Sequence, residues 1–203
     1  GVAQHLEAAA ELPWTFYGQL AETQLGRDSS LEFTVPEITD DTVTRFIERY
    51  PAARRAAALA QLGRLSEVES EMRRLHADLD PADDRTFLAL AISLQAPAAQ
   101  LRAAEYGGRD TAAGFCPTTS FEPENGFSLD RALLYAIVRQ ESYFNPKAVS
   151  VSNARGLMQL LPSTARDMDR SHNYRRAPAP LFEPGLNMRL GQDYVTWLMT
   201  EFH

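Results

Sequence analysis

Residues 135–165 read YAIVRQESYFNPKAVSVSNARGLMQLLPSTA, and this stretch runs from an apolar helix into a polar tripeptide and then into turns. The helix is predicted from Leu129 to about Ser142, with Ser128 as its cap, because serine favours the N-cap position and apolar residues follow at helical spacing. These apolar residues recur at i, i+1, i+4 and i+5 as Leu133, Leu134, Ile137 and Val138. The next position in the series is Glu141.

Glu141 is the candidate acid of this stretch. As a member of the apolar stripe it is expected on the buried face, where loss of hydration disfavours the charged carboxylate. The last helical turn adds the negative end of the helix dipole, which acts in the same direction, and Arg139 lies roughly 160° away around the helix. A carboxyl that stays protonated near neutral pH suits general acid catalysis. Spacing alone leaves a second interpretation open, because a glutamate at a helix end is more often a solvated group or a local ion-pair partner.

The residues after this helix predict a small polar site in apolar surroundings. RGLMQLL, residues 155–161, is predicted to form a short helix that ends at Pro162, and Ser163 is predicted to cap the next helix. Gln159 lies between apolar Met158 and Leu160. An apolar pocket with a few inward polar groups suits recognition of a neutral sugar or amide.

Composition excludes several classes of function. The chain has 203 residues, a formal net charge of -7 and no dense Lys/Arg block, so it is not expected to bind nucleic acid. The single cysteine, Cys116, excludes an internal disulfide framework and a multi-cysteine metal site. The histidines show no zinc-ligand spacing and are expected to be structural or exposed: His5, His76, His172 and His203. No bound metal or other cofactor is predicted.

The remaining sequence predicts an all-α protein with two regions. Residues 1–108 carry helix start and stop signals at short intervals, typical of an α-solenoid, or helical superhelix, although no fixed-period repeat is present. Within them Thr39 or Asp40 is predicted to cap one helix, and Ser66 with Glu69 is predicted to form a capping box. Residues 109–126 are rich in Gly, Pro and Thr and are predicted to be a linker. Residues 127–203 form a second helical domain, with a last helix over 186–202.

The ends of the chain and its apolar runs bear on the membrane. The sequence begins Gly-Val-Ala-Gln, without an initiator methionine, a charged n-region or an apolar h-region. Its longest apolar run, residues 87–96, is too short to span a bilayer. We therefore expect a soluble chain without a transmembrane segment, either processed or excised from a longer one.

One family shares the motif of the opening stretch. RQESYFNPKAVSVSNARGLMQLLPSTA resembles the catalytic signature of the soluble lytic murein transglycosylases, lysozyme-like enzymes that cut bacterial peptidoglycan. Downstream, LFEPGLNMRLGQDYV at 181–195 resembles another segment of that family, and LPWTFYGQLAETQLG at 12–26 resembles part of its N-terminal superhelix. The matching motif positions are Glu141-Ser142, Ser150, Gly156-Leu157-Met158-Gln159, Pro162 and Thr164-Ala165.

The resemblance implies a reaction and a set of site residues. Residues 127–203 would be the N-terminal part of a lysozyme-like transglycosylase domain, with Glu141 as its single acid/base catalyst. The bond cut would be the β-1,4 link between N-acetylmuramic acid and N-acetylglucosamine, giving 1,6-anhydromuramyl ends without water. Ser150 would hydrogen-bond near the acid or the acetamido group, and Met158 and Gln159 would line sugar subsites. The partners implied are peptidoglycan strands and cell-wall synthesis or remodelling proteins, in the periplasm.

Two departures from the family pattern bear on this interpretation. Asn153 stands where the family commonly has Gly, in a turn where Asn tolerates a left-handed conformation. The family also continues to an Ala-Tyr-Asn-Ala-Gly segment that this sequence does not contain, so we expect a C-terminally truncated catalytic domain. Two alternatives stay open: a hydrolytic lysozyme-like muramidase, in which water replaces the muramyl hydroxyl, and an inactive helical scaffold.

Overall fold

The computed structural model describes residues 1–31, 33–107 and 109–202, so His203 lies outside the described residues. The chain divides into two compact units, Gly1–Thr118 and Thr119–His203. Within the described residues the regular elements are helices, with two isolated antiparallel bridges near residues 149–160. The all-α prediction is confirmed. None of the helices in the described part of the chain is both long and apolar enough to cross a bilayer.

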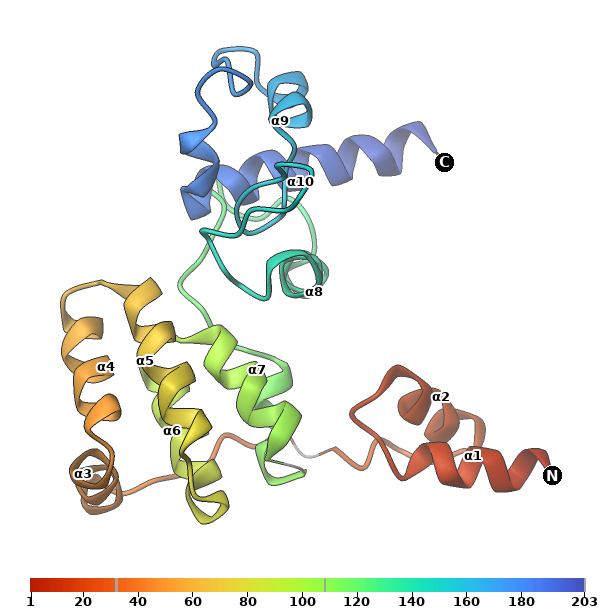
Figure 1. Cartoon of the computed structure of the whole chain (residues 1–203). Helices are drawn as coiled ribbons and strands as arrows, with labels where there is room; N and C mark the ends of the chain where they lie inside the picture. The colour runs from red at the N-terminus through yellow and green to blue at the C-terminus, as the bar shows by residue number, and fades with distance from the viewer. Residues whose placement is uncertain (32, 108, 203) are drawn as a thin grey trace. The chain divides into compact units, whose positions relative to one another are not determined.

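The first unit is a succession of short helices (Figure 1). α1 packs on α2, α4 on α5 and α6 on α7, and Phe46, Met72 and Phe87 lie in a shared core over α3 to α7. Pro51, at the start of α4, needs no backbone donor in a first helical turn. The elements are α1 (Val2–Ala10), α2 (Phe16–Gln24), α3 (Asp40–Arg49), α4 (Pro51–Gln61), α5 (Leu65–Ala77), η1 (Pro81–Asp83), α6 (Asp84–Ser93), α7 (Pro97–Tyr106) and η2 (Arg109–Phe115).

The caps predicted in this unit have different outcomes. Thr39 caps α3 as predicted, since its hydroxyl accepts a hydrogen bond from the Thr42 amide at 3.3 Å. The capping box at Ser66 and Glu69 is wrong, because α5 begins one residue earlier and Ser66 lies inside the helix. The carboxylate of Glu69 instead accepts hydrogen bonds from the amides of Ala98 and Ala99, at 2.9 and 3.0 Å. It therefore satisfies free N–H groups at the start of a neighbouring helix, α7.

Residues 109–126, expected as a linker, are divided between the two units. η2 packs on α7, and a Cβ atom added at Gly114 would lie 2.2 Å from the carbonyl oxygen of Gln100. The buried amide of Gln100 also binds Thr118, accepting from its amide at 2.8 Å and donating to its carbonyl at 2.9 Å. Residues after Thr118 belong to the second unit, where the Tyr135 hydroxyl donates to the Phe121 carbonyl at 2.9 Å.

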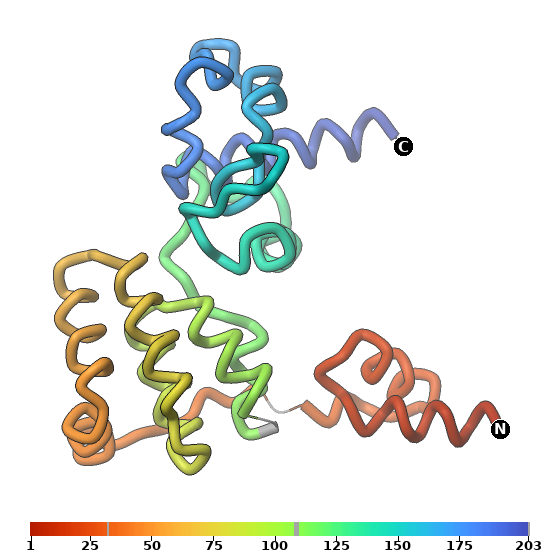
Figure 2. Tube along the Cα trace, viewed as in Figure 1, coloured from red at the N-terminus to blue at the C-terminus, as the bar shows by residue number. Residues whose placement is uncertain are grey.

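The second unit contains α8 (Arg131–Ser142), α9 (Pro162–Met168), η3 (Ala179–Phe182) and α10 (Pro184–Glu201). Long irregular segments connect α8 to α9 and α9 to η3 (Figure 2). Their apolar side chains, together with those of the helices, form the core of the unit, which includes Leu134, Val138, Leu157, Leu181, Met188 and Leu190.

Three local predictions for this unit are wrong. α8 is capped by Asp130, whose carboxylate accepts from the Leu133 amide at 3.0 Å, and not by Ser128. RGLMQLL forms turns instead of a helix, because Gly156 (φ 76°) and Gln159 (φ 45°) adopt left-handed conformations that a right-handed helix excludes. α9 begins at Pro162, so Ser163 lies within the helix and does not cap it.

Candidate active site

The apolar stripe of α8 divides into two rows, and Glu141 belongs to the more exposed one. Leu134 and Val138 are fully buried in the core of the second unit. The second row consists of Leu133, Ile137 and Glu141, which follow one another at intervals of four residues. This row is more exposed, and Leu133 is 42% exposed. Glu141 itself is exposed, so its predicted burial is wrong. The two-row stripe places the carboxylate at the open side of the helix because only one row can face the core.

The end of α8 follows Glu141 directly. Tyr143 and Phe144 have φ angles of 53° and 59°, which are left-handed conformations that cost a non-glycine residue roughly 1–2 kcal/mol each. Phe144 is only 2% exposed, and burying a phenylalanine contributes about 1.5–3 kcal/mol, which offsets much of this strain. The chain therefore reverses at once after Ser142 and leaves Glu141 in the last turn of the helix.

A tight turn holds the second set of predicted site residues. Arg155 and Leu160 exchange both backbone hydrogen bonds, at 3.0 and 3.1 Å, and the Gly156 amide donates to the Ala148 carbonyl at 3.0 Å. The side-chain amide of Gln159 donates to the carbonyls of Gly156 and Ala148, at 3.0 and 3.2 Å. Both N–H donors of this side chain thus serve the turn, which leaves its carbonyl oxygen as the polar atom for a ligand.

Glu141, Met158 and Gln159 line one open groove of about 320 Å³ in the second unit. Among the described residues that line it, Glu141 is the sole carboxylate. The other lining residues come from α8, the turn before α9, α9 itself and α10: Ile137, Leu160, Leu161, Thr164, Gly191, Tyr194, Val195 and Leu198. The groove thus combines one acid, one amide, one phenol and one threonine hydroxyl with a largely apolar wall.

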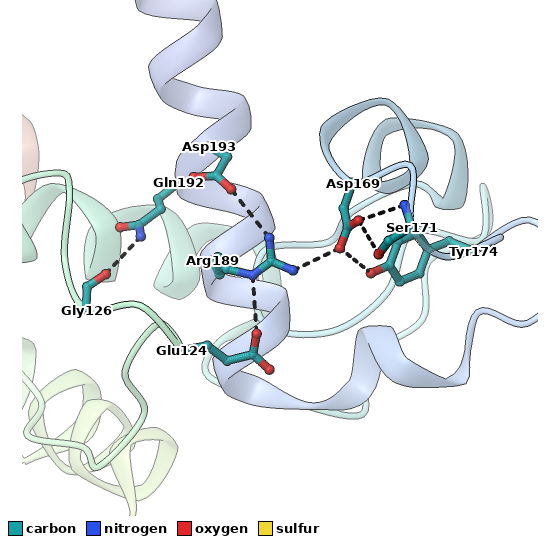
Figure 3. Close-up of polar contacts among 8 residues, drawn as sticks. All are labelled: Glu124, Gly126, Asp169, Ser171, Tyr174, Arg189, Gln192 and Asp193. Carbon is teal, nitrogen blue, oxygen red and sulfur yellow. Dashed lines mark hydrogen bonds and ion pairs between the residues drawn. The ribbon is translucent and has the colours of Figure 1, made fainter.

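The side chains of Arg189 and Gln192 fix α10 through polar contacts (Figure 3). α10 supplies one wall of the groove. Arg189 binds three carboxylates, those of Asp169 at 3.0 Å, Glu124 at 3.2 Å and Asp193 at 3.8 Å. Gln192 donates to the Gly126 carbonyl at 2.9 Å, and its carbonyl oxygen accepts from the Ser128 amide at 3.0 Å. α10 is therefore tied to the segment that leads into α8.

Electrostatics in this cluster favours an ionised Asp169. The hydroxyl and amide of Ser171 donate to one oxygen of this carboxylate, at 2.6 and 2.9 Å, while Arg189 donates to the other. These hydrogen bonds hold the pKa of Asp169 well below its usual range. In the described part of the chain, no group of three or more His, Cys, Asp or Glu side chains is arranged to hold a metal ion.

Ser150 is not one of the groove-lining residues. It is exposed, its hydroxyl accepts from the Ala154 amide at 3.0 Å, and its own amide donates to the Ala154 carbonyl at 3.0 Å. Its contact with a substrate stays a prediction. No site role was predicted for Tyr194 and Gly191, although both lie in the segment 181–195 that carries the downstream resemblance. Their spacing of three also places them on one helix face.

Comparisons with known proteins identify the second unit. Residues 118–203 match the family model of the transglycosylase SLT domain. These residues form a transglycosylase SLT domain. This chain is 39% identical over 79 residues to membrane-bound lytic murein transglycosylase C of Histophilus somni (strain 2336), covering 37% of this chain and 22% of that protein. It is 35% identical over 79 residues to the soluble lytic murein transglycosylase of Salmonella typhimurium, covering 38% and 12%.

Solved structures extend the likeness beyond the SLT domain. The 70 kDa soluble lytic transglycosylase SLT70 from Escherichia coli has a TM-score of 0.73 and 25% identity, over 98% of this chain and 33% of that one. An inactive Glu-to-Gln mutant of lytic transglycosylase Slt from Pseudomonas aeruginosa has a TM-score of 0.61 and 22% identity, over 97% and 33%. The chain spans less than a quarter of the two curated relatives and a third of these two structures. The family predicted from the motif is confirmed.

Proposed function

We propose that the SLT domain cuts the β-1,4 bond between N-acetylmuramic acid and N-acetylglucosamine in peptidoglycan and forms 1,6-anhydromuramyl ends. The observation that carries this proposal is that Glu141, Met158 and Gln159 line one groove, with Glu141 as its sole carboxylate among the described lining residues. One acid in a groove with apolar walls fits a reaction on a neutral sugar backbone. The lytic murein transglycosylases named above support the substrate class.

Glu141 acts first as an acid and then as a base. Its protonated carboxyl gives a proton to the glycosidic oxygen, the bond from that oxygen to the muramyl C1 breaks, and the N-acetylglucosamine alcohol leaves. The muramyl N-acetyl group stabilises the positive charge at C1, as in substrate-assisted glycosidases, so a second protein carboxylate is not needed. The Glu141 carboxylate then takes the proton of the muramyl 6-hydroxyl while that oxygen bonds to C1. The acid is regenerated and no water is consumed.

The apolar lining of the groove supports an internal hydroxyl, in place of water, as the nucleophile. Ile137, Leu161 and Leu198 belong to the apolar wall near the acid, and a bound glycan strand displaces water from such a surface. Gln159 contributes a carbonyl oxygen that accepts from a sugar hydroxyl or acetamido N–H, because both its donors serve the turn. Met158 supplies apolar contact, and Ser150 is proposed to reach the acetamido group from the neighbouring turn.

The substrate also implies the setting. We infer a periplasmic location, since peptidoglycan lies there, with cell-wall synthesis or remodelling proteins as partners. Relatives named as membrane-bound or soluble murein transglycosylases support this inference.

Digestion of purified peptidoglycan tests the proposal. Wild-type protein, Glu141→Gln and Glu201→Gln are compared by the release of soluble muropeptides. Glu201 is an exposed glutamate in the last turn of α10 and does not line the groove, so it is the matched control. We expect release by the wild type and Glu201→Gln and none by Glu141→Gln. Equal release by all three removes Glu141 from the chemistry, and no release by any of them favours the scaffold alternative for this chain.

A further inference from the structure

Asn187 is a fully buried polar residue in the first turn of α10, and its side chain hydrogen-bonds to two other segments of the chain. Its Oδ1 accepts from the Met158 amide at 2.7 Å. Its Nδ2 donates to the carbonyls of Arg155 and Leu181, each at 2.9 Å. A buried amide with one acceptor and both donors engaged fixes the groups around it, because loss of any bond leaves a buried polar atom unpaired.

Close packing around Asn187 makes this arrangement tight. A Cβ atom added at Gly156 would lie 2.2 Å from the Leu181 carbonyl oxygen and 2.4 Å from Nδ2 of Asn187. The turn therefore touches the amide directly, with glycine at the point of contact. One helical turn further along α10, a Cβ atom added at Gly191 would lie 2.1 Å from the sulfur of Met158. One face of α10 thus contacts Met158 at two points: Asn187 binds its backbone amide, and Gly191 packs against its side chain.

We infer that Asn187 is a positioning residue of the active site: it sets the Met158–Gln159 wall of the groove from behind, without lining the groove itself. This inference rests on the proposed function for its effect on catalysis. Asn187 acts through Met158, whose amide it binds, and through Gln159, the next residue of the same turn.

The variant Asn187→Asp distinguishes a role of Asn187 in positioning the Met158–Gln159 turn from a role in folding alone. The ionised carboxylate keeps an oxygen that accepts from the Met158 amide. Its second oxygen replaces the Nδ2 donor and faces the Arg155 and Leu181 carbonyl oxygens, which it cannot hydrogen-bond. Protonation restores one donor, so the defect is expected to ease as the pH falls. Asn173→Asp is the charge-matched control, because Asn173 is exposed and its Oδ1 accepts only from the amide of Arg176 in the described hydrogen bonds.

Two measurements are made on wild type, Asn187→Asp and Asn173→Asp: hydrogen exchange of the Met158 amide by NMR, and kcat/KM on peptidoglycan at neutral and mildly acidic pH. We expect faster Met158 exchange and a kcat/KM about 100-fold lower for Asn187→Asp at neutral pH, the scale of a misplaced site wall. Relative to wild type, this loss shrinks on acidification, and Asn173→Asp behaves as wild type throughout.

Wild-type exchange and activity in Asn187→Asp would overturn the inference, and so would a loss that does not change with pH relative to wild type. If wild-type protein releases no product, the proposed function fails, while Met158 exchange still decides whether Asn187 holds the turn. Should Asn187→Asp not fold, the wild type decides instead: a Met158 amide that exchanges as fast as that of exposed Val151 contradicts the inference.

Discussion

Nη2 of Arg189 lies 3.0 Å from Oδ2 of Asp169, and this ion pair joins α10 to the chain that follows α9 (Figure 3). Both side chains are 18% exposed. Removing one partner of a mostly buried ion pair is costly, because little water can reach the remaining charge to solvate it. The pair therefore stabilises the wall of the groove that α10 supplies.

Asp169→Asn is expected to lower the free energy of unfolding by about 2–3 kcal/mol at neutral pH. Because hydrogen bonds from Ser171 and Arg189 depress the pKa of Asp169, its contribution is present above the ordinary aspartate pKa and is lost as the pH falls below it. The difference between variant and wild type should thus shrink in acid. Urea unfolding over a pH series measures it, with Asp193→Asn, 46% exposed and 3.8 Å from Arg189, as a control expected to cost under about 1 kcal/mol.

Glu69 gives the first unit the opposite pH dependence. Burial raises the pKa of this carboxyl to about 7, although hydrogen bonds from the Ala98 and Ala99 amides lower it. A pKa raised by folding means that stability is full at low pH and is lost as the pH rises through about 7. We expect the wild type to lose on the order of 2–3 kcal/mol between about pH 5 and about pH 8 through this group.

Glu69→Gln tests that dependence, because a neutral amide has no proton to lose. Denaturant unfolding of the first unit should show a flatter pH profile in the variant than in the wild type. Identical slopes would mean that the Glu69 carboxyl does not titrate in this range.

Two glycines with nearly equal φ angles allow the cost of a left-handed backbone to be measured separately from the cost of a steric clash. Gly126 (φ 79°) has no heavy atom within 4 Å of an added Cβ, whereas Gly156 (φ 76°) meets the Leu181 carbonyl at 2.2 Å. Gly126→Ala should cost only the left-handed conformation, about 1 kcal/mol, and Gly156→Ala at least about 3 kcal/mol. Thermal unfolding of both variants checks this, and equal costs would refute the close packing of the turn on α10.

The two rows of α8 are tested by neighbouring leucines. Leu134 is fully buried and Leu133 is 42% exposed. Leu134→Ala is expected to cost about 2–5 kcal/mol and Leu133→Ala less than about 1 kcal/mol. If the Leu133 variant is the less stable one in urea unfolding, the row that contains Glu141 faces the core after all.

Much of the fold follows from local signals in the sequence. Caps and apolar spacing predict the start of α3 and the bounds of α8 and α10 to within a few residues, because these elements form through contacts between near neighbours. The α8 stripe was predicted as well, but spacing cannot say which of its two adjacent rows is buried. That choice depends on where the other segments of the unit pack, so the exposure of Glu141 was missed.

The site shows a similar limit. Glu141, Met158 and Gln159 were predicted and lie in one groove, yet RGLMQLL was expected to be helical because its apolar letters do not reveal left-handed angles. No role was predicted for Asn187, Arg189 and Gln192, although all three lie in the segment 181–195 that carries the downstream resemblance. Their partners lie many positions away in the sequence and share no periodicity with them, so only the folded chain brings them together.

We propose that Glu141 drives bond cleavage without water, and the decisive measurement is the mass of the products formed in ¹⁸O-labelled water. Transfer to the muramyl 6-hydroxyl gives anhydro ends that carry no label and are lighter by one water than a reducing end. We expect anhydro ends from the wild type and none from Glu141→Gln. New ¹⁸O-bearing reducing ends formed by the wild type in place of anhydro ends, or anhydro ends formed equally by Glu141→Gln, would rule out this mechanism.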